Sequence, residues 1–229
     1  HARQVLEQVD LIEGIYKNDV VSKPHFAVSC QHYSFAVNAF VDVIRRFDAY
    51  QYDFTIREEQ THEIIEDVTN LKSELGVIYL SSKNTEVLSK MLKRNELEFT
   101  ELFTATPHVF ICDSHPLAKK KSITMEDLQD YPYLTYEQGE YNSQYFSEEF
   151  VSTLDSRKNI RVRDRATLFN LIIGLNGYTV CSGVISAELN GRNIISKPLD
   201  VEEYMRIGII TRKGVVLSRY AREYIEALK

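Results

Sequence analysis

The stretch that decides the fold is HPLAKKKSITMEDLQDYPYLTY, residues 115–136. Its opening His-Pro pair ends an extended run, because proline restricts the preceding residue to extended backbone. A basic loop of three lysines follows. Thr124 then begins a short helix, with Asp127 at the three-residue spacing of a capping box. Pro132 stops this helix, and YLTY at 133–136 predicts a new strand.

Composition limits what the rest of the chain does. The 229 residues are 44% hydrophobic and 26% charged, which is typical of a globular protein with a substantial core. A net charge of −6 argues against this chain binding a nucleic-acid backbone by itself. No apolar run approaches the roughly 20 residues of a membrane helix, and the polar N-terminus does not resemble a signal peptide. These features predict a cytoplasmic protein.

The N-terminal stretch is expected to be helical. Val5, Val9, Ile12 and Tyr16 recur at spacings of four, three and four, the pattern of a coiled coil. This stripe is too short to stand alone, so it packs on the body or pairs with another chain. The chain begins with His-Ala and not Met, which suggests a fragment of a longer protein.

The first half alternates between strands and helices. Apolar or alternating runs predict strands at 26–30, 52–57 and 75–80, each followed by a helix. Ser34 and Thr61 are the expected caps of the first two helices, whose apolar stripes end at Phe47 and Leu71. The third helix is expected at 85–94. This βαβαβα order predicts a parallel sheet with helices on its faces.

The second half resumes the same alternation after a long extended stretch at 97–113. Helices are expected at 143–154, 166–175 and 217–228, and strands at 159–163, 178–181, 194–198 and 205–211. Extended crossovers near 97–113 and 197–204 divide the chain into two α/β lobes. The prediction is a linker helix at 1–20, one lobe at 21–103 with 201–229, and a second lobe at 104–200.

These residues resemble the effector-binding domain of LysR-type transcriptional regulators over residues 21–229. The opening segment carries most of the resemblance, and FAVSCQ (26–31), ELGVIYLSS (74–82), GYTVCSG (177–183) and MRIGII (205–210) support it. Gly76 departs from it, because the family often has an acidic residue there. The resemblance implies two Rossmann-like lobes, as in type 2 periplasmic binding proteins, with a ligand in the cleft. It also implies that the N-terminal helix joins a DNA-binding domain, absent here, and pairs in dimers.

Three stretches are candidates for the ligand site. Ligands of open α/β folds bind beyond the carboxyl ends of strands, where helix N-termini favour anions. SCQHYS (29–34), the serines at 81–82 and TYEQGEYN (135–142) occupy such places, and Gly139 would allow close backbone approach. The candidate ligand-binding residues are Ser29, Gln31, His32, Tyr33, Ser81, Thr104, Thr106, Thr135, Glu137 and Tyr141.

Structural roles compete with these assignments. A serine or threonine at a strand end is more often structural, and His32 fits either a surface position or a cleft where its titration makes binding pH-sensitive. Cys30, Cys112 and Cys181 have no metal or disulfide spacing, so reduced thiols are favoured over a redox sensor at Cys30. We expect no metal and no cofactor.

The favoured function is a regulatory domain that binds a small, anionic metabolite between the lobes and changes lobe or oligomer geometry. The resemblance also implies homodimers or homotetramers, with the helix at 35–47 and the helix after Ala166 at an interface. The alternative is a transport-associated solute-binding protein on the same fold. An enzyme is disfavoured because GxSxG, HExxH, P-loop and GxGxxG motifs are absent from the sequence.

Overall fold

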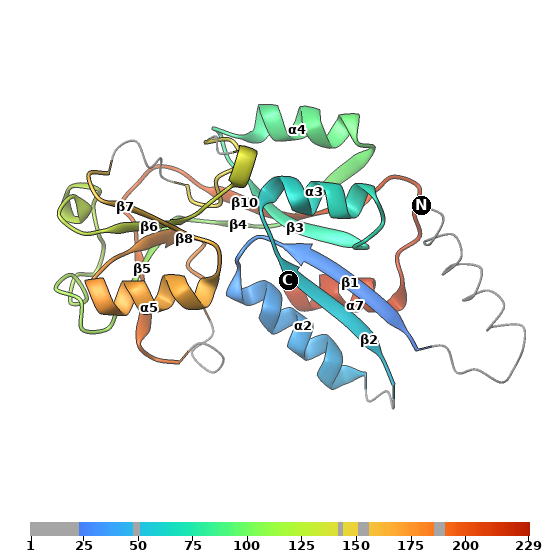
Figure 1. Ribbon diagram of the computed structural model, residues 1–229, viewed down its shortest axis with the longest axis horizontal. Coiled ribbons are helices and arrows are strands. Elements are labelled where there is room, and N and C mark those ends of the chain that lie inside the picture. Colours follow the sequence, from blue (N-terminus) through green and yellow to red (C-terminus); the bar gives the residue numbers. More distant parts are fainter. Residues whose placement is uncertain (1–22, 48–50, 142–143, 151–155, 186–190) are drawn as a thin grey trace, which may run out of the picture.

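Two lobes lie side by side in the computed structural model (Figure 1). It describes residues 23–47, 51–141, 144–150, 156–185 and 191–229. The first lobe is built on a five-stranded sheet, and the second on a three-stranded and a two-stranded sheet. The helix predicted at 1–20 lies outside the described residues.

The sheet of the first lobe has the strand order β2-β1-β3-β10-β4. Its strands are β1 (His25–Cys30), β2 (Asp53–Glu58), β3 (Leu75–Leu80), β4 (Leu97–Ala105) and β10 (Met205–Arg212). β1 runs parallel to β2 and β3, as predicted. β10 is antiparallel to β3 and β4, so the sheet is mixed and not wholly parallel. The difference arises because β10 enters the sheet on its return from the second lobe.

Helices cover both faces of this sheet (Figure 1). They are α2 (Ser34–Arg46), α3 (Thr61–Thr69), α4 (Thr85–Arg94) and α7 (Arg219–Leu228). All six residues of β3 are buried, with Val77 in the core under α2 and α7 and Ile78 in the core under α3 and α4. This explains why LGVIYL is continuously apolar, since a strand covered on both faces has no solvent side.

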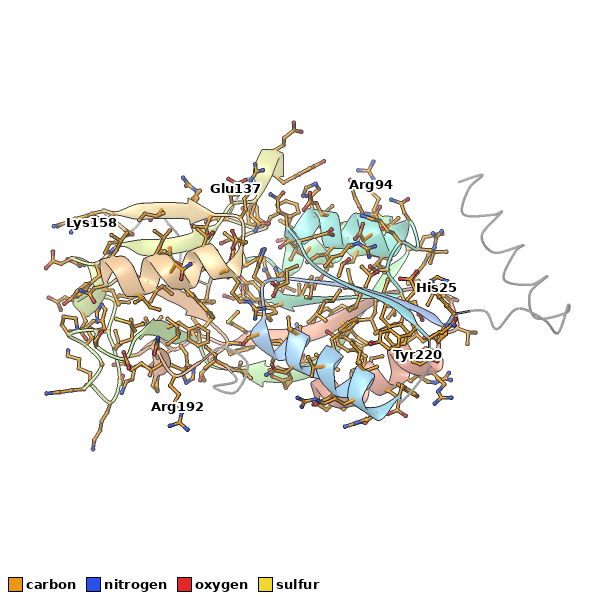
Figure 2. The ribbon with its side chains drawn as sticks, turned by 60° about the horizontal axis from the view of Figure 1, so that its bottom comes forward. His25, Arg94, Glu137, Lys158, Arg192 and Tyr220 are labelled. Carbon is orange, nitrogen blue, oxygen red and sulfur yellow. The ribbon has the colours of Figure 1, made fainter. Side chains whose placement is uncertain are left out.

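The second lobe has a smaller framework. Its strands are β5 (His108–Cys112), β6 (Tyr133–Tyr136), β7 (Asn159–Val162), β8 (Thr179–Cys181) and β9 (Ile194–Pro198), and its helix is α5 (Arg165–Leu175). The sheets have the orders β8-β5-β9 and β6-β7. α5 buries Leu168 and Ile172 against Phe110 and Leu134. Figure 2 shows Lys158 and Arg192 on this lobe and Glu137 near its border with the first.

Two extended crossovers join the lobes. The run predicted at 97–113 is two strands, β4 and β5, which belong to different sheets and are separated at Thr106 and Pro107. The second crossing leads from β9 to β10. β4 extends to Ala105, two residues past the predicted boundary at 103. The lobe limits at 103/104 and 200/201 therefore stay a proposal, which sheet membership supports.

The segment at 115–136 packs as its sequence indicates. Thr124 N–H donates to Asp127 Oδ2 over 3.0 Å, and Asp127 N–H donates to Thr124 Oγ1 over 3.3 Å. These bonds precede a short 3-10 helix, Glu126–Leu128. His115 is buried; its Nδ1 accepts from Leu117 N–H and its Nε2 contacts the Asn176 carbonyl at 3.1 Å. The motif thus ties this loop to the end of α5.

Two helix predictions were wrong. The helix predicted at 143–154 is absent from residues 144–150, which form turns, and its other residues lie outside the described part. Ser147 Oγ bonds with the N–H of Glu149, a local bond that competes with helix formation. α3 ends at Thr69, and Leu71 is exposed with a φ of +58° instead of packing in the core. Residues 138–141 and 144–150 are called the strap below.

The expected helix caps were displaced by one residue. Tyr33 and Gln60 occupy the cap positions of α2 and α3, and Ser34 and Thr61 are the first helical residues. Gln60 forms a capping box with Glu63. The two hydroxyls instead donate across the lobes: Ser34 Oγ to the Val184 carbonyl and Thr61 Oγ1 to the Phe146 carbonyl.

Candidate functional site

A small cavity lies between the lobes and has a volume of about 30 Å³. The first lobe contributes His32, Tyr33 and Ser34 at the start of α2. The second lobe contributes Phe110, Tyr136, Glu148, Glu149, Arg165, Leu168, Phe169, Thr179, Val180, Cys181, Ser182 and Val184. This volume admits one or two water molecules.

His32 is the centre of the polar contacts in the cavity. Its backbone N–H donates to Glu148 Oε2 over 2.7 Å, and its Nδ1 lies 2.9 Å from the same oxygen. Nε2 contacts the Arg163 carbonyl at 3.1 Å. The ring stacks on Tyr136 with centroids 3.9 Å apart. Burial lowers the His32 pKa, but the charges of Glu148 and Glu58 outweigh it and leave the pKa raised. The imidazolium satisfies both acceptors.

Two adjacent carboxyl groups of the strap are buried at this place. Glu148 also accepts a hydrogen bond from Gln138 Nε2, and Glu149 accepts one from Tyr136 N–H over 2.7 Å. Burial is the larger cause, and the charge of Glu148 the smaller one, of a rise in the pKa of Glu149 to about 8. At neutral pH Glu149 is therefore mainly protonated.

Tyr33 and Thr135 bring unpartnered hydroxyls to the region between the lobes. Tyr33 lines the cavity and is 5% exposed, yet its phenol oxygen has no hydrogen-bond partner among the described residues. The hydroxyl of Thr135, on β6, is likewise buried without a partner there, although Thr135 does not line the cavity. A buried hydroxyl without a partner costs free energy, which a ligand polar group relieves.

Charged and polar contacts hold the lobes together around the cavity. Arg165, in the first turn of α5, lies 3.0 Å from Glu58 at the end of β2. Tyr79 Oη contacts the Ser147 carbonyl at 3.1 Å. These pairs join the two lobes beside the cavity.

Three predicted residues have structural partners instead. Ser29 Oγ bonds to Asp67 Oδ2 at 2.7 Å inside the first lobe. Gln31 Nε2 donates to Thr61 Oγ1, and Gln31 Oε1 accepts from the N–H of Tyr79. Ser81 Oγ accepts from Lys83 N–H in the turn before α4. None of the three lines the cavity.

Four more predicted residues lie outside the cavity lining as well. Thr104 is exposed and bonds to Glu101, and Thr106 is exposed before β5. Glu137 forms an ion pair with Arg163 within the second lobe. Tyr141 is 45% exposed and packs on His62 with centroids 4.2 Å apart. Of the ten predicted residues, the cavity therefore brings together only His32 and Tyr33.

Sequence reasoning missed Glu148, Glu149 and Arg165. The glutamates lie in a segment that was interpreted as a helix, where adjacent carboxylates indicate a solvated face. Arg165 precedes an apolar helix by one residue, and arginine is ordinarily exposed there. The position of Arg165 shortly after a strand was the one sequence feature that pointed to the site, because ligands bind at the carboxyl edge of the strands.

The cysteines do not have the environment of a reactive thiol. Cys30 is buried, and burial raises its pKa well above the usual value. The pKa of Cys181 is also raised by burial. All three cysteines are free. A thiol that resists ionisation is a poor nucleophile, so Cys30 and Cys181 resemble structural cysteines.

The described residues hold neither a metal-ligand cluster nor a helix of membrane-spanning character. No group of three or more histidine, cysteine, aspartate or glutamate side chains there is arranged to hold a metal ion. Within the same ranges, no helix is both long and apolar enough to cross a membrane.

Two α/β lobes with a cavity between them define a fold of the type 2 periplasmic-binding-protein kind. Solved structures share it. The effector binding domain of QuiR in complex with shikimate has a TM-score of 0.60 and 18% identity, covering 90% of this chain and 96% of that one. The reduced OxyR regulatory domain of Pseudomonas aeruginosa has a TM-score of 0.61 and 17% identity, with coverage of 90% and 96%.

Sequence comparison gives the family. The model of the LysR substrate binding domain matches residues 28–229, so the chain belongs to this family of transcriptional regulators, which are not enzymes. The malolactic fermentation system transcriptional activator of Lactococcus lactis subsp. lactis (strain IL1403) is 24% identical over 185 residues, 72% of this chain. This chain spans 62% of the length of that relative. The match favours a regulator over a transport-associated binding protein.

Proposed function

We propose that this chain senses a small anionic metabolite for a transcriptional regulator and binds it at the cavity between the lobes. The observation that carries the proposal is the Tyr33 phenol, which lines the cavity, is buried and lacks a partner among the described residues. A ligand oxygen beside Tyr33 would accept its hydrogen bond. His32 is the neighbouring contact.

The local charges support an anion. The His32 N–H lies immediately before α2, where the helix dipole favours negative charge, and it already holds a carboxylate. Arg165 adds a guanidinium to the cavity wall. Protonation of Glu149 near neutral pH reduces the repulsion that an incoming acid meets. The ligand class is a small organic acid, of which shikimate, bound by the QuiR domain, is one example.

Binding would change the geometry of the lobes. A cavity of about 30 Å³ does not hold a metabolite, so the ligand selects a more open arrangement. The contacts that close the cavity, among them Arg165–Glu58, would be exchanged for contacts with the ligand. The ligand shifts the equilibrium only by its differential affinity for the two arrangements.

The experiment is a thermal-shift screen of organic acids, sulfur metabolites and amino acids, followed by calorimetric titration of any ligand found. Tyr33→Phe is expected to weaken binding by about tenfold, the effect of one lost buried hydrogen bond. Tyr204→Phe is the matched control, because Tyr204 is 55% exposed between β9 and β10. Equal affinity of wild type and Tyr33→Phe would refute this site.

Assembly and DNA binding belong to the proposal too. Ile173 and Leu175 of α5 are 43% and 47% exposed, and α2 has half-buried Val37 and Val41 on its outer side. Such apolar helix surfaces suit pairing into homodimers or homotetramers. DNA would be contacted through a domain outside this chain, in the bacterial cytoplasm. Light scattering tests assembly, and Ile173→Glu is expected to lower the mass.

A further inference from the structure

The strap lies across the first lobe at the position where ligands of this fold class would enter. Gln138 Oε1 accepts from the N–H of Thr61, the first residue of α3, over 3.1 Å. Thr61 Oγ1 donates to the Phe146 carbonyl over 2.8 Å. The strap thereby contacts the first lobe beyond the carboxyl end of β2, where α3 begins.

The strap approaches the first lobe closely at Gly139. Gly139 has a φ of +55°, and a Cβ atom there would lie 2.8 Å from Gln60 Oε1. Only glycine adopts this backbone at this distance without strain. The chain is therefore shaped locally to let the strap approach the start of α3.

One carboxylate of the strap is placed as a bound acid would be. The side chain of Glu148 is 3% exposed, 116 residues from His32 in the chain. Its oxygens accept the His32 backbone N–H, face His32 Nδ1 and accept Gln138 Nε2. A buried carboxylate with several donors is the arrangement that proteins use for anionic ligands.

A second observation points to a ligand at the same place. The Tyr33 phenol lines the cavity beside these groups and has no partner among the described residues. The Glu148 carboxylate therefore uses the donors of His32 but leaves the donor of Tyr33 unused. An acid with a further oxygen would satisfy both.

We propose that Glu148 is a built-in competitor of the effector: an organic acid takes its place on His32, and the strap is released from α3. This rests on the proposed function and specifies its chemistry, because the group that displaces Glu148 is a carboxylate. The release of Thr61 and Tyr79 from the strap would then couple ligand binding to lobe separation.

Competition with a tethered group has a measurable consequence. A tethered carboxylate acts at an effective concentration in the millimolar range or above, so it lowers the apparent affinity of the free acid. Removing the Glu148 carboxylate is expected to tighten acid binding by about tenfold or more. A residue that only supported the site would weaken binding when removed.

The first arm of the test needs no knowledge of the effector. Glu148→Ala leaves a space, and it frees the donors that held the carboxylate. Acetate fits this space. Acetate at tens of millimolar is therefore expected to raise the melting temperature of the variant by several degrees. Acetamide, which lacks the charge, is the ligand control. Glu86→Ala is the protein control, because Glu86 is an exposed residue of α4 paired with Lys90. A Glu148→Ala protein that acetate does not stabilise more than acetamide overturns the proposal.

The second arm compares affinities for an acid from the screen. Tighter binding to Glu148→Ala than to wild type supports displacement, and equal or weaker binding overturns displacement alone. An acid series that binds neither protein refutes the anionic effector itself. If Glu148→Ala does not fold, Glu148→Gln replaces it in this arm, since the amide keeps the size of the side chain but removes its charge.

Discussion

The edge of the first lobe and the strap of the second lobe satisfy their polar groups in different ways. At the first edge, Ser29 and Gln31 bond with residues of their own lobe. In the strap, Gln138 and Glu148 bond with residues of the other lobe. Ser29 and Gln31 are therefore satisfied without the second lobe, whereas the contacts of Gln138 and Glu148 depend on both lobes. A ligand that opens the lobes would mainly disturb the strap.

The largest expected effect tests the contact that joins these regions. His32→Ala leaves the Glu148 charge buried without its partner, so we expect the free energy of unfolding to fall by about 3 kcal/mol in chemical denaturation. His25→Ala is the control: the His25–Asp53 pair is exposed, and a loss below about 1 kcal/mol is expected. Similar losses for both variants would contradict the difference between the regions.

Stability is also expected to depend on pH through the strap. The pKa of Glu149 rises from 4.5 to about 8, so the folded state retains a proton that the unfolded state releases. The free energy of unfolding therefore decreases as pH rises from about 4.5 to about 8, by at most about 1.4 kcal/mol per pH unit. His32, whose pKa is raised, loses its contribution in the same direction, above its ordinary pKa of 6.5.

Substitutions of Glu149 and Glu59 separate the pH dependence of stability that arises in the strap from the pH dependence that arises in the first lobe. The titratable groups that interact with His32 or Glu149 are Glu148, Glu58, Asp164, Tyr33, Tyr79, Tyr133, Tyr136 and Cys181. Glu59, in the first lobe, has its pKa raised to about 7 by burial and Asp67. Glu149→Gln should flatten the pH profile of unfolding more than Glu59→Gln does. The opposite order would place the dominant titration in the first lobe.

Replacing two glycines by alanine is expected to change stability in opposite directions, and by less than His32→Ala does. Gly139→Ala forces a Cβ against Gln60 at a φ of +55° and is expected to cost about 1–2 kcal/mol. Gly174→Ala, within α5 and with no atom within 4 Å of its Cβ, is expected to stabilise by about 0.5–1 kcal/mol. Thermal denaturation of both proteins measures the difference. A neutral Gly139→Ala would mean that the strap adapts freely.

The smallest effect concerns two buried tyrosines. Tyr224 Oη donates to the Ala36 carbonyl over 2.9 Å, so Tyr224→Phe should cost about 1 kcal/mol. Tyr33→Phe should change stability by less than about 0.5 kcal/mol, because its hydroxyl has no partner to lose among the described residues. A larger loss for Tyr33→Phe in denaturant titrations would show that its hydroxyl already has a structural role.

Much of the fold was predictable because it depends on local patterns. The continuous apolar run of β3 and the break at Pro132 indicated strands, whereas the stretch at 97–113 was predicted as one run and is two strands. The two crossovers followed from extended stretches between the βα series. β10 was recognised as a strand, but its antiparallel direction depends on the path of the whole chain.

The site was less predictable because its partners are distant in sequence. His32 and Tyr33, predicted because they follow β1 at the carboxyl edge of the sheet, line the cavity, and their role in ligand binding stays a prediction. Glu148 was not, because two adjacent glutamates in a polar stretch ordinarily face solvent, and only the fold brings them to His32. Ser29 and Ser81 were proposed from position alone, and their partners Asp67 and Lys83 show structural roles.

The most direct test of the central claim is a crystal structure of this domain with an organic acid identified by the screen. We expect the acid between the lobes, with a carboxylate on the His32 N–H, an oxygen at hydrogen-bond distance from Tyr33 Oη, and Glu148 moved away. An acid bound elsewhere, with Glu148 still on His32, would contradict it.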